Sequence, residues 1–211
     1  KKMKLVLVGN GMAGVRTIEE LLKLAPDLYD ITVFGAEPHG NYNRILLSPV
    51  LAGEMTMPEI MLNDLDWYRD HGITLHAGKK VVKIDRVRRK VIAEAGDGSG
   101  TEADYDRLLL ATGSYPWVPP IAGSQHHECF VYRTIEDLKA IRSAAKSGKS
   151  GVVIGGGLLG LEAAGALKAL GLETHVVEFA PVLMAEQLDG QGGQLLRRKI
   201  GRPPVRLEVE D

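Results

Sequence analysis

The sequence predicts an α/β protein made of two domains, each built around a parallel sheet. Three observations support this prediction. One glycine-rich loop, KLVLVGNGMAG, occupies residues 4–14, and a second of the same design, SGVVIGGGLLG, occupies residues 150–160. Around each loop, an apolar strand precedes the glycines and a helix follows them. One GxGxxG pattern often arises by chance, but two copies in matching context are specific.

The first domain is predicted to begin with a βαβ unit. Leu5–Val8 is a continuous apolar run, typical of a strand buried on both faces. Apolar residues at helical spacing follow as far as Ala25, and Pro26 ends the pattern. The next strand is expected at Ile31–Phe34. This order of elements predicts a right-handed crossover between parallel strands.

Periodicity is weaker in the middle of the chain, where a helix is expected near Leu62–Asp70. Residues 94–104, EAGDGSGTEAD, are predicted to form a surface loop by composition. A strand at Arg107–Ala111 and a proline-rich linker then end the first domain. Three short strands are expected between the helix and the loop, the last two joined by the turn DRVRRK: Ile73–His76, Val81–Ile84 and Val91–Ala93.

A second βαβ unit is predicted after the linker. Thr134 can cap a helix that runs to about Ser147, with Gly148 as its stop. The unit itself comprises a strand at Val152–Ile154, a helix at Leu158–Leu170 and a strand at Thr174–Glu178. We therefore expect a first domain over residues 1–118, a linker and helix over 119–150, and a second, incomplete domain over 151–211.

Both loops have the chemistry of a Rossmann-like dinucleotide-binding site. The first glycine permits a tight turn, the second lets the backbone approach a diphosphate, and the third lets the helix pack closely on the sheet. An acid roughly 20 residues further on would bind a ribose hydroxyl. Glu37 and Glu178 occupy these positions, and Glu178 predicts a preference for NADH because a carboxylate repels the 2′-phosphate of NADPH. The six loop glycines are Gly9, Gly11, Gly14, Gly155, Gly157 and Gly160.

Composition limits the partners and the cellular compartment that can be expected for this chain. The 26 Lys and Arg residues nearly balance the 27 Asp and Glu residues, which argues against nucleic acid or an anionic membrane as partner. Apolar runs are far short of the ~20 residues that span a bilayer. Cys129 is the only cysteine, which fits a reducing compartment, and we expect a cytoplasmic protein. His126, His127 and Cys129 share one loop without further ligands, so no metal site is predicted.

The segment LLLATGSYPWVPP, placed between the two loops, resembles the pyridine nucleotide-disulfide oxidoreductase superfamily. The resemblance implies the FAD/NAD(P)-binding fold, with FAD at the first loop and NAD(P)H at the second. It implies a three-layer arrangement around the sheet, with the turn Ala111, Thr112 and Gly113 on the FAD side. No side-chain general base is predicted, because hydride transfer between stacked rings depends on orientation.

At finer grain, YNRILLSPVLAGE, IGGGLLGLEAA and LMAEQLDGQGGQLLRRKI resemble the N-terminal part of the large subunit of NAD(P)H-dependent nitrite reductases. By this resemblance Arg44 would reach the FAD, and Val82 would offer its backbone to the adenine. Glu162 would lie beside the nicotinamide–flavin contact, and Arg133 is a weaker cofactor candidate. The same module is similar to the electron-transfer component of assimilatory nitrate reductase and to rubredoxin and ferredoxin reductases.

By the same resemblance, disulfide reductases of the family carry a cysteine pair soon after the first βαβ unit. The stretch NYNRILLSPVLAGE in this chain has no cysteine, so electrons are expected to leave the flavin directly. The acceptor would be a metal centre, a carrier protein or oxygen. Siroheme and an iron–sulfur cluster, absent from this chain, are the acceptors in the nitrite reductase interpretation. That interpretation adds the nitrite reductase small subunit as a partner, together with a homo-oligomeric state and a role in nitrate assimilation.

The chain also departs from the family pattern. The family's later strand ending in Gly-Asp is missing, and the tail GRPPVRLEVED is expected to depart from the helix and strand that follow LLRRKI in relatives. We therefore expect a fragment that binds FAD weakly and does not itself reduce nitrite. Two alternatives stay open: a stand-alone rubredoxin or ferredoxin reductase, and a flavin- or NAD-binding sensor or scaffold without turnover.

Overall fold

The computed structural model describes residues 2–201 and 205–209, the last five by their backbone alone. The chain divides into two compact units. The first comprises Lys1–Arg44 and Ile60–Tyr115, and the second comprises Ile45–Glu59 and Pro116–Asp211. The boundaries expected from the sequence kept residues 45–59 in a continuous first domain, whereas these residues pack with the C-terminal half. The assignment of one cofactor to each domain stays a prediction.

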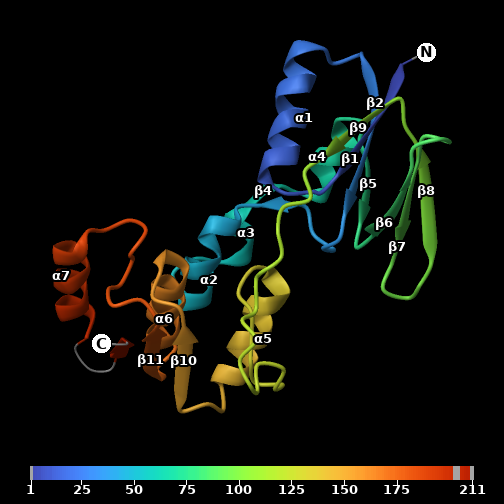
Figure 1. The fold of residues 1–211 in the computed structure, drawn as a ribbon. Helices are drawn as coiled ribbons and strands as arrows, with labels where there is room; N and C mark the ends of the chain where they lie inside the picture. Colours follow the sequence, from blue (N-terminus) through green and yellow to red (C-terminus); the bar gives the residue numbers. More distant parts are fainter. Residues whose placement is uncertain (1, 202–204, 210–211) are drawn as a thin grey trace. The chain divides into compact units, whose positions relative to one another are not determined.

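The first unit is built on a four-stranded parallel sheet with the order β5-β2-β1-β9 (Figure 1). Its strands are β1 (Met3–Val8), β2 (Tyr29–Gly35), β5 (Thr74–Ala77) and β9 (Arg107–Leu110). All neighbouring pairs run parallel, as the apolar runs predict. The carboxyl ends of β1, β2 and β9 therefore lie at one edge of the sheet.

Helices cover one face of this sheet. They are α1 (Met12–Leu24) and α4 (Leu65–Asp70). Leu5 and Leu7 of β1 point to this side and pack with Ile18 and Tyr68. Alternate residues of a strand point to opposite faces, so the neighbouring valines of β1 need a second cover.

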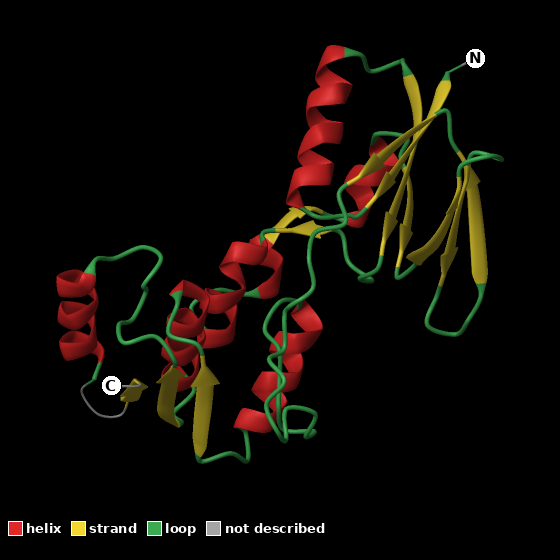
Figure 2. Cartoon of the chain, in the orientation of Figure 1, coloured by secondary structure: helices red, strands yellow, loops and turns green. Residues whose placement is uncertain are grey.

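An antiparallel sheet supplies that cover and completes three layers (Figure 2). It contains β6 (Lys80–Asp85), β7 (Lys90–Glu94) and β8 (Gly100–Asp104). Val6 and Val8 of β1 pack on Val91 and Ala93 of β7. The expected hairpin of β6 and β7 is confirmed.

The surface loop expected over residues 94–104 is wrong in its second half. Residues 100–104 form β8 and pair antiparallel with β7. Glycine, serine and aspartate dominate the composition and predict a loop, but Ala103 packs against the apolar cluster beneath the sheet. Burial of alternate side chains therefore outweighs the weak strand propensity of this segment.

The segment from Gly35 to Asp70 contains more short elements than its periodicity indicates. The helix expected near Leu62–Asp70 begins at Leu65, where the Asp64 side chain accepts a hydrogen bond from the Trp67 N–H at 2.8 Å. Residues 61–63 instead pair with a short strand. The additional elements are β3 (Asn41–Tyr42), β4 (Met61–Asn63), the 3-10 helix η1 (Arg44–Leu46), α2 (Leu47–Ala52) and α3 (Met57–Ile60).

The second unit contains a three-stranded parallel sheet with the order β10-β11-β12. The Thr134 cap is confirmed, because its side chain accepts from the Asp137 N–H while the Asp137 carboxylate accepts from the Thr134 N–H. The elements are α5 (Ile135–Ala145), β10 (Ser150–Ile154), α6 (Leu158–Ala169), β11 (Glu173–Glu178), α7 (Gly190–Ile200) and β12 (Val205–Val209).

The departure expected for the tail is wrong where the structure describes it. Residues 205–209 follow α7 and pair parallel with β11 as strand β12. Two adjacent prolines suggest an irregular tail, but they precede the strand, and the alternating VRLEV run satisfies strand geometry. Residues 202–204 and 210–211 of this tail lie outside the described residues.

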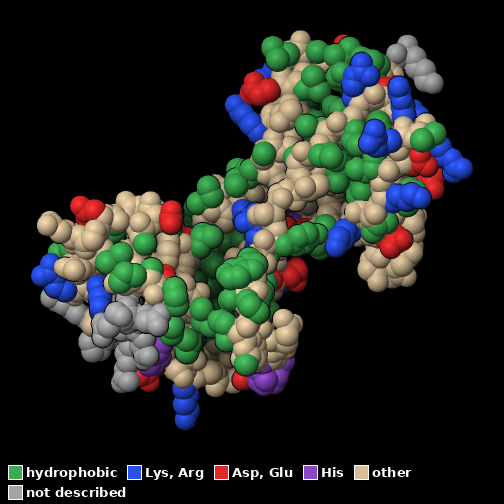
Figure 3. Space-filling model, in the orientation of Figure 1, with side chains coloured by type: hydrophobic (Ala, Val, Ile, Leu, Met, Phe, Trp, Pro, Cys, Tyr) green, Lys and Arg blue, Asp and Glu red, His purple; other side chains and the backbone are tan. Residues whose placement is uncertain are grey.

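One face of the second sheet carries helices, and the other has exposed apolar side chains. Ala164 of α6 and Val176 of β11 form a buried cluster on which Val153 packs. Val152 and Ile154 point to the opposite face and are 60% and 65% exposed. Apolar side chains are visible on the drawn surface of each unit (Figure 3). The third layer seen in the first unit is thus not found in the second among the described residues.

Candidate cofactor-binding sites

The first glycine loop packs against the ATG turn. Gly9 has φ +108°, and a Cβ there would lie 2.1 Å from the carbonyl oxygen of Ala111. A Cβ on Gly14 would lie 2.9 Å from the Gly9 carbonyl oxygen and 3.1 Å from the Ala111 side chain. Glycine is required at both positions by the fold itself. The structure thus brings Gly9, Gly14 and Ala111 together.

The second loop repeats this geometry. Gly155 has φ +117°, and its N–H donates to the Val177 carbonyl oxygen at 2.8 Å. A Cβ on Gly160 would lie 1.9 Å from the carbonyl oxygen of Gly155. The start of α6 can therefore pack against the loop only because residue 160 has no side chain.

The middle glycine of each loop is different, because folding does not require it. Gly11 and Gly157 have φ values of −88° and −80°, which any residue adopts. A Cβ at either position would meet nothing within 4 Å. The space in front of the backbone is therefore open at both positions, and a side chain there would occupy it.

The helices that follow the loops begin without side-chain caps. Gly11 and Gly157 are the N-cap residues of α1 and α6, and neither helix has an acidic residue in its first turn. By contrast, Asp64, Thr134 and Asp189 cap α4, α5 and α7. Uncapped N–H groups at a helix N-terminus attract anions. The residues present fit a diphosphate at each loop.

Glu37 and Arg44, which the sequence analysis predicts at the first site, form an ion pair. The Arg44 guanidinium lies 2.7 Å from the Glu37 carboxylate. Tyr42 donates its hydroxyl to the other carboxylate oxygen of Glu37 at 2.6 Å. The Arg44 guanidinium also lies over the ring of Tyr42. All three groups follow β2 and are largely buried, so the acid is held in one orientation near the edge of the sheet.

Glu178 ends β11 and is bound by the backbone of the second loop. Its carboxylate accepts hydrogen bonds from the Gly156 N–H at 2.6 Å and from the Ala180 N–H at 2.8 Å. These bonds place a negative charge directly beside the glycine loop. Gly156 lies between the predicted glycines, and its closeness to the acid was not expected from the sequence.

Glu162 lies on α6 two residues after Gly160 and accepts a hydrogen bond from the Ser48 hydroxyl at 3.0 Å. Tyr132 in turn donates its hydroxyl to the Ser48 oxygen at 3.1 Å. Neither Ser48 nor Tyr132 is expected at a site from the sequence. Their positions in α2 and before α5 give no local signal, and only the fold brings them to Glu162.

The remaining predicted residues are more dispersed. Val82 is 51% exposed and lies where the pairing of β6 with β7 shifts register, so it occupies a bulge. Thr112 is exposed, and Gly113 has φ +70° at the ATG turn. Arg133 is half-buried, and its backbone N–H donates to Asp137 at the start of α5. The cofactor roles of Val82 and Arg133 stay predictions.

Asn10, inside the first loop, is a residue that sequence reasoning missed. It accepts a hydrogen bond from the Tyr68 hydroxyl at 2.6 Å and donates to the His39 carbonyl oxygen at 3.2 Å. Burial raises the pKa of Tyr68, so its hydroxyl stays protonated as a donor. A polar residue between two loop glycines is the only signal in the sequence for this contact.

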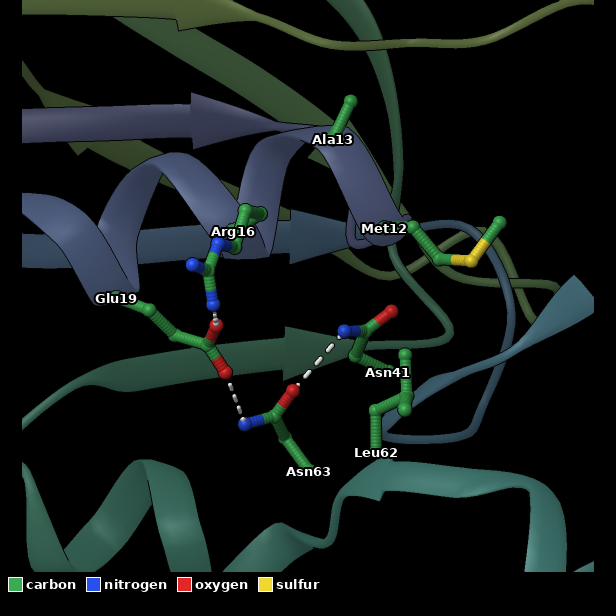
Figure 4. A pocket seen from close by; sticks show the side chains of 7 residues that line it. All are labelled: Met12, Ala13, Arg16, Glu19, Asn41, Leu62 and Asn63. Atoms are coloured by element: carbon green, nitrogen blue, oxygen red, sulfur yellow. Dashed lines mark hydrogen bonds and ion pairs between the residues drawn. The ribbon is translucent and has the colours of Figure 1, made fainter.

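A shallow cavity of about 570 Å³ lies beside α1 in the first unit. Asn41 donates its amide to the Asn63 side chain, which donates to Glu19, and Arg16 pairs with Glu19 (Figure 4). The Asn41 Oδ1 is buried without a hydrogen-bond partner among the described residues. Met12, Ala13 and Leu62 complete the wall.

The loop around Cys129 is exposed. Ligand atoms of His126, His127 and Glu128 lie within 4.8 Å of one another, and all three side chains face solvent. Cys129 is also exposed. Among the described residues, no helix is long and apolar enough to cross a membrane.

Comparison with known proteins places this geometry in a family. The family model described as pyridine nucleotide-disulphide oxidoreductase matches residues 3–210, almost the whole chain. The chain belongs to this family. Its fold is accordingly the α/β fold of nucleotide-binding reductases, as the two glycine loops predict.

Proteins similar to this chain include subunits of a nitrite reductase and of an assimilatory nitrate reductase. The chain is 52% identical to the nitrite reductase (NADH) large subunit of Escherichia coli K12 over 209 residues, which are 99% of this chain and 24% of that protein. It is 46% identical to the assimilatory nitrate reductase electron transfer subunit of Bacillus subtilis 168, over 100% of this chain and 27% of that protein. The chain thus spans about a quarter of the length of these curated relatives.

A solved structure of a carrier-protein complex is also similar. It contains putidaredoxin reductase covalently joined to putidaredoxin. The reductase is 31% identical to this chain with a TM-score of 0.83, and the match covers 98% of this chain and 49% of that chain. This similar structure is therefore of a reductase joined to a separate protein, putidaredoxin.

Proposed function

We propose that this chain is the electron-input module of an NADH-dependent nitrite reductase, in which it binds FAD and NADH. Two features support the proposal: the pair of open glycine cradles, and high identity to nitrite reductase large subunits over 99% of the chain. The protein supplies two sites that hold the reacting rings, and bound FAD supplies the chemistry, accepting a hydride and passing electrons on.

The first unit would hold FAD. The diphosphate would bind the backbone at Gly11, and the uncapped end of α1 favours its charge. Glu37, held by Arg44 and Tyr42, would accept hydrogen bonds from ribose hydroxyls. The bulged backbone at Val82 would bind the adenine of FAD.

The second unit would hold NADH. Gly157 and the start of α6 provide the second cradle, and Glu178 provides a fixed carboxylate for the ribose. That charge disfavours a 2′-phosphate, which supports NADH over NADPH. Glu162, in the first turns of α6, would lie nearest the reacting nicotinamide.

Electrons would leave FAD for an iron–sulfur and siroheme centre supplied outside these residues. The nitrite reductase small subunit and a homo-oligomeric assembly remain proposed partners. A cytoplasmic location is proposed because the single, exposed Cys129 suits a reducing compartment.

The observation that carries the proposal is the lack of any folding requirement for glycine at residues 11 and 157. The test is to saturate the protein with FAD, remove oxygen and add NADH. Loss of the flavin absorbance is expected, followed by its return when an electron acceptor is added. A protein that takes up no FAD, or whose bound flavin stays oxidised with excess NADH, would overturn the proposal and favour a scaffold.

A carrier-protein reductase is the second candidate, favoured by the likeness to putidaredoxin reductase. The two candidates differ in the acceptor. Rapid reduction of rubredoxin or a ferredoxin by the FAD-loaded protein, at rates near its ferricyanide turnover, would favour this candidate. Slow reduction of both carriers supports the nitrite reductase module.

A further inference from the structure

Three polar side chains from separate elements of the second unit form one hydrogen-bonded chain. Ser48 lies on α2, Tyr132 precedes α5, and Glu162 lies on α6 directly after the second glycine loop. The Tyr132 hydroxyl lies 3.1 Å from the Ser48 oxygen, which lies 3.0 Å from the Glu162 carboxylate. All three side chains are half-buried.

The direction of both hydrogen bonds follows from the carboxylate. An ionised carboxylate only accepts, so the Ser48 hydrogen points at Glu162 and the Ser48 oxygen accepts from Tyr132. Burial raises the pKa of Tyr132, outweighing the hydrogen bond with Ser48 that lowers it, and the charge of Glu162 adds to the rise. Tyr132 therefore keeps its proton at neutral pH and remains a donor.

Ser48 is held rigidly by the packing of its helix. Leu47, Val50 and Leu51 of α2 are buried, and α2 packs on α6. Arg142 of α5 donates to the carbonyl oxygen of Val50. The hydroxyl of Ser48 is thus a fixed donor, and a fixed donor orients its acceptor more effectively than a mobile one.

We propose that Ser48 and Tyr132 are positioning residues that hold the Glu162 carboxylate beside the nicotinamide site, where its charge favours the oxidised ring. The inference rests on the proposed function, in which NADH binds the second loop. Transfer of a hydride, with its two electrons, from nicotinamide C4 to flavin N5 leaves the nicotinamide ring positively charged. An anion already fixed in place stabilises that developing charge without reorganising.

The test compares two nucleotides that differ in ring charge. NAD⁺ has the cationic ring, and tetrahydro-NAD is a neutral-ring analogue of NADH that cannot donate a hydride. Their dissociation constants are measured by calorimetry on the FAD-loaded protein and expressed as the ratio of analogue to NAD⁺. This ratio is independent of turnover, and a general loss of structure lowers both affinities without changing it.

Ser48→Ala is expected to lower the ratio about tenfold, the size of one hydrogen bond to a charged group. Ser48→Thr keeps the hydroxyl and should keep the ratio. Tyr132→Phe should lower it about threefold, as one neutral hydrogen bond is lost. The double variant should match Ser48→Ala alone, because Tyr132 acts through Ser48. Glu162→Gln should lower the ratio at least as far as Ser48→Ala.

Ser143→Ala is the matched control, since Ser143 is an exposed serine on α5 of the same unit, and its ratio should equal that of the unaltered protein. Two results would overturn the inference: an unchanged ratio in Glu162→Gln, or an unchanged ratio in Ser48→Ala when Glu162→Gln lowers it. An unaltered protein that binds neither nucleotide would instead overturn the proposed function.

Discussion

The carboxylate of Glu178 accepts a hydrogen bond of 2.6 Å from the N–H of Gly156, the residue between the first two glycines of the second loop. A second bond from the Ala180 N–H, at 2.8 Å, fixes the same carboxylate from its other side. Glu178 at the end of β11 is therefore hydrogen-bonded to the loop after β10. In the proposed function its charge lies where a nucleotide ribose would bind.

Replacing Glu178 should change the choice of nucleotide. Glu178→Ser removes the negative charge that opposes a 2′-phosphate, so kcat/KM for NADPH relative to NADH should rise at least about tenfold. Steady-state kinetics with both nucleotides measures the ratio. Glu186→Gln, which neutralises an exposed acid of the same unit, is the control and should leave it unchanged. An unchanged ratio in Glu178→Ser would show that this acid does not face the ribose.

The open glycines should affect binding and leave stability nearly intact. Gly11→Ala and Gly157→Ala place a methyl group in open space, so the free energy of unfolding should change by less than about 1 kcal/mol. The methyl group lengthens the contact to the diphosphate, so FAD and NADH affinity respectively should fall at least about tenfold. Flavin fluorescence and calorimetry measure the affinities, and thermal unfolding measures stability.

Two other glycines on α6 serve as controls for that experiment. Gly165→Ala, on an exposed face, should alter neither binding nor folding adversely. Gly160→Ala should destabilise the second unit, because its Cβ would overlap the Gly155 carbonyl. Full nucleotide binding by both Gly11→Ala and Gly157→Ala would contradict the cradle assignment.

Tyr68→Phe should lower both the stability of the first unit and its affinity for FAD. The Tyr68 hydroxyl donates to Asn10 and accepts from the Asn41 N–H in a buried site. Leaving those partners unpaired should cost about 1–3 kcal/mol of unfolding free energy in a denaturant titration. FAD affinity should fall too, because Asn10 lies within the glycine loop. Tyr105→Phe alters a half-buried tyrosine of the same unit, so it is the control and should change both quantities much less.

His76 should make the first unit less stable in mild acid. Burial lowers the pKa of His76, which stacks on Phe34, and the charge of Lys79 lowers it further. The folded state therefore favours the neutral ring, so stability is complete above the ordinary pKa of 6.5. It declines as pH falls from 6.5 toward the lower folded value, because the unfolded chain gains the proton first.

The measurement is the difference in Tm between pH 7.5 and pH 5.5. His76→Gln should show a smaller loss than the unaltered protein, while His127→Gln, at an exposed histidine, should show the same loss as the unaltered protein. Equal losses in all three proteins would contradict a role for His76.

Much of the fold was predictable because its signals are local. A run such as Leu5–Val8 reports a strand buried on both faces, and the Thr134 cap with Asp137 reports a helix start. The segment at residues 100–104 was not predictable, because its strand depends on pairing with β7 and on the packing of Ala103 rather than on its own composition. The tail at residues 205–209 likewise becomes a strand through pairing with β11.

The sequence was sufficient to locate the two glycine loops and to indicate the kind of ligand expected, since the positive φ of Gly9 and the close approach of Gly160 to Gly155 depend on the local course of the chain. Tertiary structure alone decided that residues 45–59 pack with the second unit and that Ser48 and Tyr132 reach Glu162. These partners lie on different helices and loops, and residue spacing carries no information about which helix faces which. Only the packing of α2 on α6 brings the groups within hydrogen-bonding distance.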